Sequence, residues 1–223
     1  MFFHEKIRSI RPTDKVLEIG PGVSPHFRSN EFLELKFDSY AEQLAQRGGE
    51  PHQDKFGERP VHLYDGGSFP FKDNEYDYVI CSHVIEHVAD PQFFLKEMFR
   101  VGSGKGYLEY PLITYEYLYN FNAHLQLLKF DFESKTLNYL PKANTALSSF
   151  SSVNALLNKS LENGWDELCA NNKALFFEGF EFSEPFPINF TSSIDQLSPL
   201  VSAVSKKSKT RSIITRVINK LPI

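Results

Sequence analysis

Short runs of mostly apolar residues recur through the first half of the chain, and each ends near a glycine, an acid, a serine or a proline. Runs of this length that lack helical periodicity are typical of buried strands. They predict strands over residues 15–19, 32–37, 61–64, 76–81 and 106–110.

Helical signals lie between these runs. Ser39 and Glu42 form a capping-box pattern, in which the serine oxygen and the glutamate carboxylate each satisfy a free backbone N–H. The helix that they begin is expected to stop at Gly48–Gly49. Asp90 followed by Pro91 starts a second helix. One face of this helix is apolar, with Phe94, Leu95, Met98 and Phe99.

Strands therefore alternate with helices or short connections from about residue 15 to 112. This order predicts an α/β fold with a doubly wound, mostly parallel sheet, because parallel neighbours require crossovers. Ligands of such sheets bind at the carboxyl ends of the strands. The residues at those ends are Gly20, Asp38, Asp65, Ser82 and Pro111.

The remainder of the chain has weaker patterns. Residues 113–195 are rich in Phe and Tyr, with a helix indicated over 152–168 and a returning strand over 176–182. We expect one domain over residues 1–195, with an aromatic-rich insertion at 113–175 that forms a substrate cap. Residues 196–223 form a basic C-terminal tail with an amphipathic helix pattern over 212–221.

Charge and composition narrow the function classes. The formal net charge is −4, so the chain as a whole has no basic excess of the kind that binds nucleic acid. The tail holds six basic residues and no acid; a solvated terminus is the favoured interpretation, and a weak contact with an anionic membrane surface is the other. The two cysteines indicate no disulfide framework, and the N-terminal pattern indicates no leader. A cytoplasmic protein is expected, and nothing in the sequence indicates an oligomeric state.

Polar and glycine residues at the first three strand ends form a nucleotide-binding pattern. Gly20 and Gly22 allow a sharp turn and the close approach of a ligand to the backbone. A carboxylate at Asp38 is placed to accept both hydroxyls of an adenosine ribose, and Asp65 suits an adenine edge.

The segment Val16-Leu-Glu-Ile-Gly-Pro-Gly22 resembles the first motif of class I S-adenosylmethionine-dependent methyltransferases. Residues 68–91 resemble later motifs of the small-molecule branch, which includes quinone-biosynthesis and surface-polysaccharide-cluster enzymes. The resemblance covers about half the chain. It implies a Rossmann-like fold, S-adenosylmethionine as cofactor and a small-molecule acceptor.

The resemblance also implies roles by position. The methionine end of the cofactor would be held by Glu18 and the backbone of Gly20, Pro21 and Gly22, and the ribose by Asp38. Asp65 and Gly66 would frame the adenine, while Ser82 and His83 would line the methyl-transfer site. The family often has a third glycine where Ser24 stands, and the connection between the first two strands is short enough to reduce its helix to a turn.

Three other motifs resemble known binding patterns, but each has a simpler structural interpretation. Pro25 occupies the position where a dinucleotide-binding G-x-G-x-x-G requires glycine, which argues against a nicotinamide enzyme. His83-Val-Ile-Glu-His87 matches an inverted zinc-protease pattern, but His83 follows a strand directly, so no metal is expected. Residues 102–106 are glycine-rich but follow a helix and open a strand, so they are a connection rather than a phosphate loop.

Candidate chemistry for the acceptor rests on two histidines. Methyl transfer to a hydroxyl or an amine benefits from a general base, and histidine titrates near neutrality. His87 and His124 are the candidates, and the aromatic residues 110–121 are expected to form part lid and part core. The alternatives are a protein that binds the cofactor without transferase activity, or a lipid-surface or partner-binding module that uses the basic tail.

Overall fold

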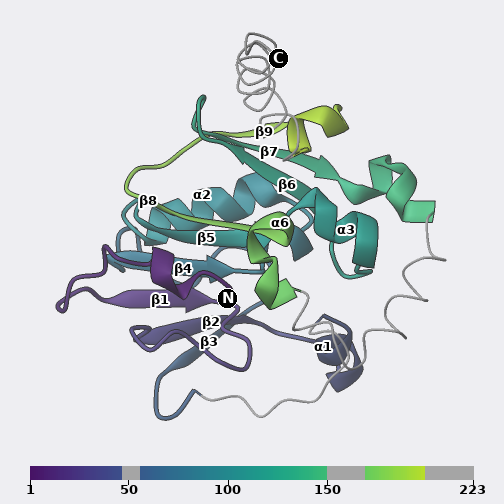
Figure 1. The fold of residues 1–223 in the computed structure, drawn as a ribbon. Helices are drawn as coiled ribbons and strands as arrows, with labels where there is room; N and C mark the ends of the chain where they lie inside the picture. The colour runs from purple at the N-terminus through teal and green to yellow at the C-terminus, as the bar shows by residue number, and fades with distance from the viewer. Residues whose placement is uncertain (47–55, 150–168, 199–223) are drawn as a thin grey trace, which may run out of the picture.

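The computed structural model describes residues 1–46, 56–149 and 169–198 of the chain. Its centre is a six-stranded sheet with the order β3-β2-β1-β4-β5-β8 (Figure 1). The strands are β1 (Val16–Ile19), β2 (Glu31–Leu35), β3 (Val61–Tyr64), β4 (Tyr78–Ser82), β5 (Gly106–Pro111) and β8 (Phe177–Phe182). β8 runs antiparallel to β5, and the other pairings are parallel.

The mostly parallel sheet and its strand positions confirm the fold predicted from the sequence. The predicted strand at 61–64 is exact, and four others agree within two residues at each end. β2 ends at Leu35, two residues before its predicted end, and this leaves Asp38 three residues beyond the strand.

One face of the sheet packs against helix α2 (Pro91–Val101). Leu17, Val79 and Leu108 project to this face and meet the apolar side of α2. The Asp90 carboxylate caps the helix by accepting a hydrogen bond of 2.9 Å from the Phe93 N–H, as its sequence pattern predicts. Burial of the helix is nearly complete along one side, at Phe94, Leu95, Met98 and Val101.

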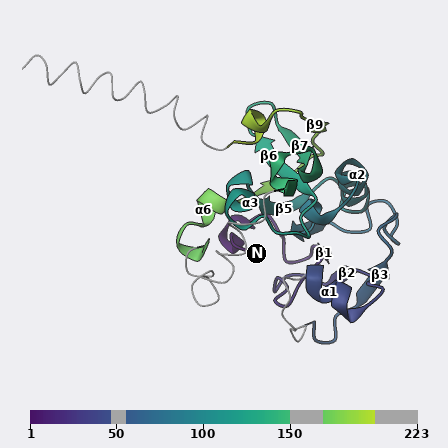
Figure 2. The same cartoon turned by 90° about the vertical axis from the view of Figure 1, so that its right-hand side faces the viewer.

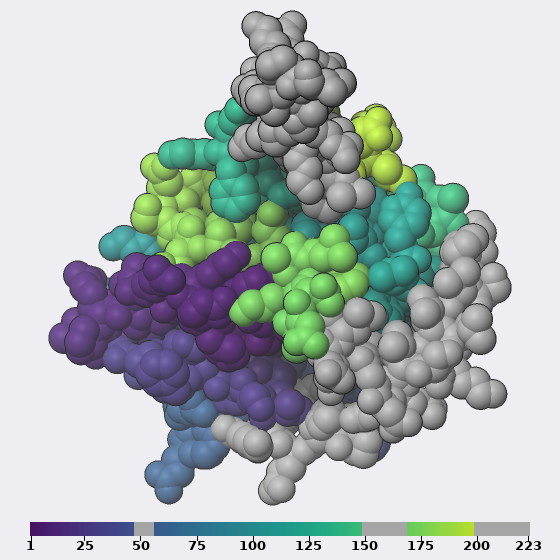
Figure 3. Space-filling model, in the orientation of Figure 1, coloured from purple at the N-terminus to yellow at the C-terminus, as the bar shows by residue number. Residues whose placement is uncertain are grey.

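Within the described residues, the opposite face of the sheet packs in part against the N-terminal segment. Val16, Ile80 and Tyr107 project to this side and pack with the buried Phe3, which precedes the short 3-10 helix η1 (His4–Lys6). The Lys6 ammonium donates to the Gly179 carbonyl at 2.8 Å, which fixes the segment to β8. Figure 3 shows this purple segment against the green surface of residues 169–185.

The connection from β1 to β2 has no helix, as its length predicts; residues 20–30 form turns. Helix α1 (Tyr40–Gln46) follows β2. The Ser39 hydroxyl accepts from the Glu42 N–H at 3.2 Å, but the Glu42 carboxylate accepts from the Asp38 N–H at 3.0 Å, one residue before the position that the capping box predicts. None of the helix residues is buried. The predicted stop at Gly48–Gly49 lies outside the described residues.

The insertion after β5 forms a second, smaller sheet that the sequence analysis did not predict. It contains α3 (Ile113–Tyr119), β6 (Gln126–Asp131), β7 (Thr136–Pro141) and the 3-10 turns η3 (Lys142–Asn144) and η4 (Ala146–Ser149). β6 and β7 pair as an antiparallel hairpin, and β9 (Ile188–Phe190) adds to β7 in parallel. Figure 2 shows these strands beyond β5, at the end of the main sheet away from β3.

The last elements are α6 (Lys173–Phe176), which leads into β8, and η5 (Ile194–Leu197). The predicted helices at 152–168 and 212–221 lie outside the described residues, as does most of the basic tail. In the part of the chain that the structure describes, no helix has the length and apolar character needed to cross a membrane.

Candidate functional site

The loop after β1 has the backbone conformation that its glycines predict. Gly20 and Gly22 both have a φ of +58°, in the left-handed region that glycine adopts without strain. A Cβ at Gly20 would lie 2.4 Å from Val84 Cγ2, so this loop is packed tightly against the residues after β4. A Cβ at Gly22 would meet no protein atom within 4 Å. The backbone there is open to a ligand.

Glu18 on β1 stabilises the connection that follows this loop through hydrogen bonds. Its carboxylate accepts hydrogen bonds from the His26 N–H at 2.8 Å and the Ser29 hydroxyl at 2.6 Å. Burial raises the pKa of Glu18 to about 7, against the lowering effect of these two donors. The carboxylate predicted to serve the cofactor therefore also holds the β1–β2 connection in place.

Asp38, Asp65 and Gly66 lie beyond the carboxyl ends of β2 and β3. Parallel pairing of β1, β2 and β3 puts these ends on the same edge of the sheet as Gly20. Both aspartates are exposed. Asp65 also has a local structural role, because its carboxylate accepts from the Gly67 N–H at 3.1 Å. Gly66 has a φ of +89°.

Ser82 and His83 follow at the end of β4 and are joined to a buried carboxylate on β5. The Ser82 hydroxyl donates to Glu109 Oε1 at 3.1 Å, and His83 Nε2 lies 3.0 Å from the same oxygen. His83 has a φ of +58°, uncommon for a residue with a side chain. The strand end predicted to line the methyl-transfer site is thus held by Glu109.

The two pKa values of this pair move apart, as expected of an ion pair. Burial alone would raise the pKa of Glu109, but the His83 imidazole beside it brings it down to about 2. Burial would likewise lower the pKa of His83, yet its hydrogen bond with Glu109 and the negative charge of the nearby Glu86 raise it. Glu109 also accepts from the backbone N–H groups of Phe2 and Phe3.

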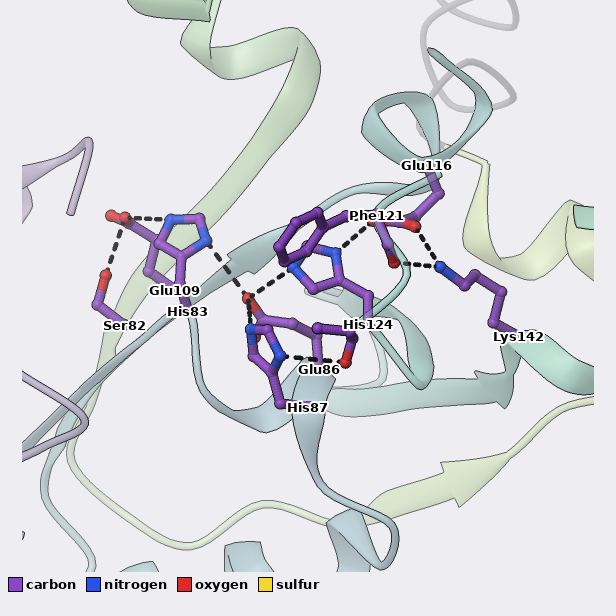
Figure 4. A network of polar contacts seen from close by, with 10 residues as sticks. Ser82, His83, Glu86, His87, Glu109, Glu116, Phe121, His124 and Lys142 are labelled. Atoms are coloured by element: carbon purple, nitrogen blue, oxygen red, sulfur yellow. Dashed lines mark hydrogen bonds and ion pairs between the residues drawn. The ribbon is translucent and has the colours of Figure 1, made fainter. Parts of the chain in front are cut away.

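The two histidines predicted as bases lie together, although they are far apart in sequence. His87 ends the short turn η2 (Ile85–His87), and His124 precedes β6. Their ring centroids are 4.7 Å apart. Burial lowers the pKa of His87 to about 4, so its imidazole is neutral near neutral pH. The Glu86 carboxylate lies between them (Figure 4).

Several residues of this network were missed by sequence reasoning. Glu86, Glu109 and Glu116 are buried carboxylates with at most 1% of the side chain exposed, and Lys142 is 9% exposed. The Lys142 ammonium donates to Glu116 at 3.0 Å. Charged residues within apolar or aromatic stretches were the available signal, because such residues are rarely buried without a partner.

The aromatic residues between 110 and 121 are mostly buried in the core. Tyr110, Tyr115 and Tyr119 are buried, whereas Tyr117 is 50% exposed. The Tyr110 hydroxyl donates to Glu178 at 2.7 Å and accepts from the Phe130 N–H. The prediction of part lid and part core leaves Tyr117 as the exposed member of this set.

The segment that contains the loop after β1 and the carboxyl ends of β1 to β4 is similar to known proteins. Residues 17–109 match the family model described as a methyltransferase domain. No curated protein matches the chain.

Solved structures with similar arrangements come from several organisms. One, from a Haloferax volcanii complex of the Trm112 activator with a methyltransferase, is 19% identical, with 46% of each chain covered and a TM-score of 0.34. A Thermotoga maritima S-adenosylmethionine-dependent methyltransferase is 23% identical, with 49% of each chain covered and a TM-score of 0.33. For a Methanosarcina mazei enzyme of this class the identity is 21%, the TM-score 0.33, and the coverage 60% of this chain and 72% of that one. The match spans about half the length of the first two.

Proposed function

We propose that this chain, whose residues 17–109 match a methyltransferase domain, transfers a methyl group from S-adenosylmethionine to a small-molecule acceptor. The observation that carries the proposal is the loop after β1. Two glycines in the left-handed conformation expose backbone at the carboxyl end of a parallel sheet. The methyltransferase match includes both of them.

The cofactor is assigned along this edge of the sheet. Glu18 and the backbone of Gly20, Pro21 and Gly22 hold its methionine end in this proposal. Asp38 takes the ribose hydroxyls, and Asp65 with Gly66 frames the adenine. The exposure of both aspartates supports this assignment, because their carboxylates are open to a ligand.

The acceptor is assigned to the side of β4 and the insertion. Ser82 ends β4, and His83 follows it with its Nδ1 3.4 Å from Glu86, the neighbour in sequence of His87. In-line methyl transfer depends mainly on alignment in a site that excludes water. Burial of His124, with 6% of the residue exposed, supports such a site. A hydroxyl or amine of a sugar, quinol or similar metabolite is the proposed nucleophile.

Calorimetric titration with S-adenosylmethionine and S-adenosylhomocysteine tests the cofactor assignment. The unchanged protein is expected to bind both, and failure to bind either would overturn the proposal. Gly22→Ala places a methyl group in the space proposed for the cofactor, and we expect a clear loss of affinity.

Gly57 offers a matched control for this substitution. It also has a positive φ, +64°, and a Cβ there would meet nothing within 4 Å. It precedes β3, at the opposite edge of the sheet from the carboxyl ends. Gly57→Ala should therefore cost similar backbone strain, about 1–2 kcal/mol, and leave cofactor affinity unchanged. Equal losses in both variants would contradict the placement of the cofactor at Gly22.

Turnover is tested separately by the release of S-adenosylhomocysteine in the presence of sugar, quinol and amine acceptors. Cofactor binding without release across these classes would favour a binding protein over an enzyme. Asp38→Ala should weaken binding of the cofactor; an unchanged affinity would refute the ribose assignment.

A further inference from the structure

Glu86, His87 and His124 bring three potential metal ligands to one place beside the proposed acceptor site. One ligand atom from each lies within 4.8 Å of the others. The Nε2 atoms of His87 and His124 are each 3.9 Å from Glu86 Oε1. Figure 4 shows both imidazoles directed at this oxygen from different elements.

The hydrogen bonds on the far side of each ring fix its tautomer. His87 Nδ1 lies 3.1 Å from the Ala123 carbonyl oxygen, which only accepts, so the ring must donate from Nδ1. His124 Nδ1 likewise contacts the Glu116 carboxylate. In the neutral ring the lone pair is then on Nε2. Two lone pairs and a carboxylate oxygen therefore face one another, an arrangement that a cation between them stabilises.

Glu86 is the one buried carboxylate of this network whose oxygens accept no hydrogen bond within the described residues. His83 lies between two carboxylates and is closer to Glu109. Its Nε2 is 3.0 Å from Glu109, whereas its Nδ1 is 3.4 Å from Glu86. Glu116, by contrast, has the Lys142 ammonium at 3.0 Å. A fully buried carboxylate without hydrogen bonds is costly, because nothing replaces the water that it lost.

We propose that Glu86, His87 and His124 bind a divalent transition-metal ion of the zinc type. Two imidazoles and one carboxylate are a recurring ligand set for zinc and for ferrous iron. The Ala123 carbonyl and the Glu116 carboxylate orient the two rings in the way that outer partners of metal-bound histidines do. Lys142 holds Glu116 in turn.

The separations are close to those of a bound ion. Bonds of about 2.0–2.2 Å to a tetrahedral metal place ligand atoms ~3.4 Å apart. The two 3.9 Å separations from Glu86 need to shrink by about 0.5 Å, and the separation between the two histidines, which lies within 4.8 Å, by at most about 1.4 Å. His87 has 18% of its side chain exposed, which leaves this side of the cluster accessible.

Three protein ligands leave at least one position open on the metal. An oxygen of the acceptor suits that position, and a metal-bound hydroxyl loses its proton more easily. This role in substrate binding rests on the proposed function, whereas metal binding itself does not. The assignment revises the expectation from sequence that the chain holds no metal. The sequence pattern paired His87 with His83, but the structure pairs it with His124.

The test begins with protein stripped by a chelator and dialysed. Titration with Co²⁺ is expected to produce visible absorption bands that saturate at one equivalent, and Zn²⁺ should displace them. Glu86→Gln and His124→Ala should each weaken Zn²⁺ affinity by at least about 100-fold, since even outer partners of metal ligands contribute 10–100-fold. His62→Ala is the control, because His62 is half-exposed and pairs with Glu31 on β2; its Zn²⁺ affinity should be unchanged.

Thermal unfolding separates a metal site from a purely structural ion cluster. Without metal, Glu86→Gln should raise the melting temperature, because it removes a buried charge while keeping the shape. Added Zn²⁺ should raise the melting temperature of the unchanged protein but not of this variant. A lower melting temperature for Glu86→Gln with no response of the unchanged protein to Zn²⁺ would overturn the proposal. Cofactor titrations of the stripped protein report on the methyltransferase assignment independently.

Discussion

Glu18 and Glu109 are buried carboxylates on the same face of the same sheet, yet their environments shift the pKa in opposite directions. Glu18 on β1 is 3% exposed and Glu109 on β5 is 0% exposed. Burial raises the pKa of Glu18 to about 7. Burial also acts on Glu109, but its histidine partner dominates and lowers the pKa to about 2. Burial by itself therefore does not decide the charge of a carboxylate.

The partners of each carboxylate explain the difference. Glu18 receives hydrogen bonds from two neutral donors that are close in sequence, His26 and Ser29. Glu109 faces His83 from the neighbouring strand and backbone N–H groups of the N-terminal segment. The edge of the sheet proposed to bind the cofactor is thus built from local turns, while the side proposed for the acceptor is built from charges that distant segments bring together.

Glu109→Ala should produce the largest loss of stability among the variants considered. It leaves His83 without the nearer of its two carboxylate neighbours and the N-terminal segment without an acceptor for two backbone N–H groups. Breaking a buried ion pair costs about 3–5 kcal/mol. Urea unfolding monitored by circular dichroism measures this loss.

Glu184→Ala is the control for this comparison. Glu184 pairs with Lys135 at 3.2 Å, but both side chains are at least 70% exposed. Exposed pairs contribute about 0–1 kcal/mol. A similar loss in both variants would show that the burial of the Glu109 network has no energetic consequence.

Glu18→Gln should change how stability depends on pH. The pKa of Glu18 is raised from 4.5 to about 7 in the folded protein, so as pH rises through this window the unfolded chain releases a proton that the folded chain retains. The unchanged protein therefore loses stability relative to Glu18→Gln between about pH 4.5 and 7. The shift corresponds to at most about 3 kcal/mol.

Unfolding free energies of both proteins at pH 5 and pH 8 measure this effect. Glu109 should show the opposite dependence: its contribution is complete above pH 4.5 and is lost as pH falls through about 2. A constant difference between the unchanged protein and Glu18→Gln would contradict the raised pKa of Glu18.

The contrast between local turns and contacts from distant segments also explains which features the sequence could predict. The strands, the α2 cap and the Gly20–Gly22 turn follow from patterns within a few residues, and the structure has them. The β6–β7 hairpin was missed because β6 is buried along most of its length and shows no alternation. The cluster at Glu86 was missed because His124 reaches it only through the folding of the insertion. No local pattern records such a contact.

Gly20→Ala tests how tightly the loop after β1 packs against the residues after β4. The new methyl group would lie 2.4 Å from Val84 Cγ2, and the φ of +58° disfavours a side chain. We expect a destabilisation of about 1–3 kcal/mol from overpacking. Val84→Ala in the same chain removes the clashing atom, so the double variant should recover part of this loss in urea unfolding. Strict additivity of the two changes would show that the loops do not press on each other.

The smallest effects should come from two helix caps, and they decide whether α1, beside the proposed cofactor position, unfolds on its own. Ser39 and Asp90 each accept a backbone N–H at the start of a helix. Asp90→Ala should cost about 1 kcal/mol of global stability, because α2 buries a full apolar face against the sheet. Ser39→Ala should cost far less, because α1 buries no residue. Its effect should instead be faster hydrogen exchange confined to α1. Equal losses of global stability from the two substitutions would mean that α1 is as strongly coupled to the core as α2.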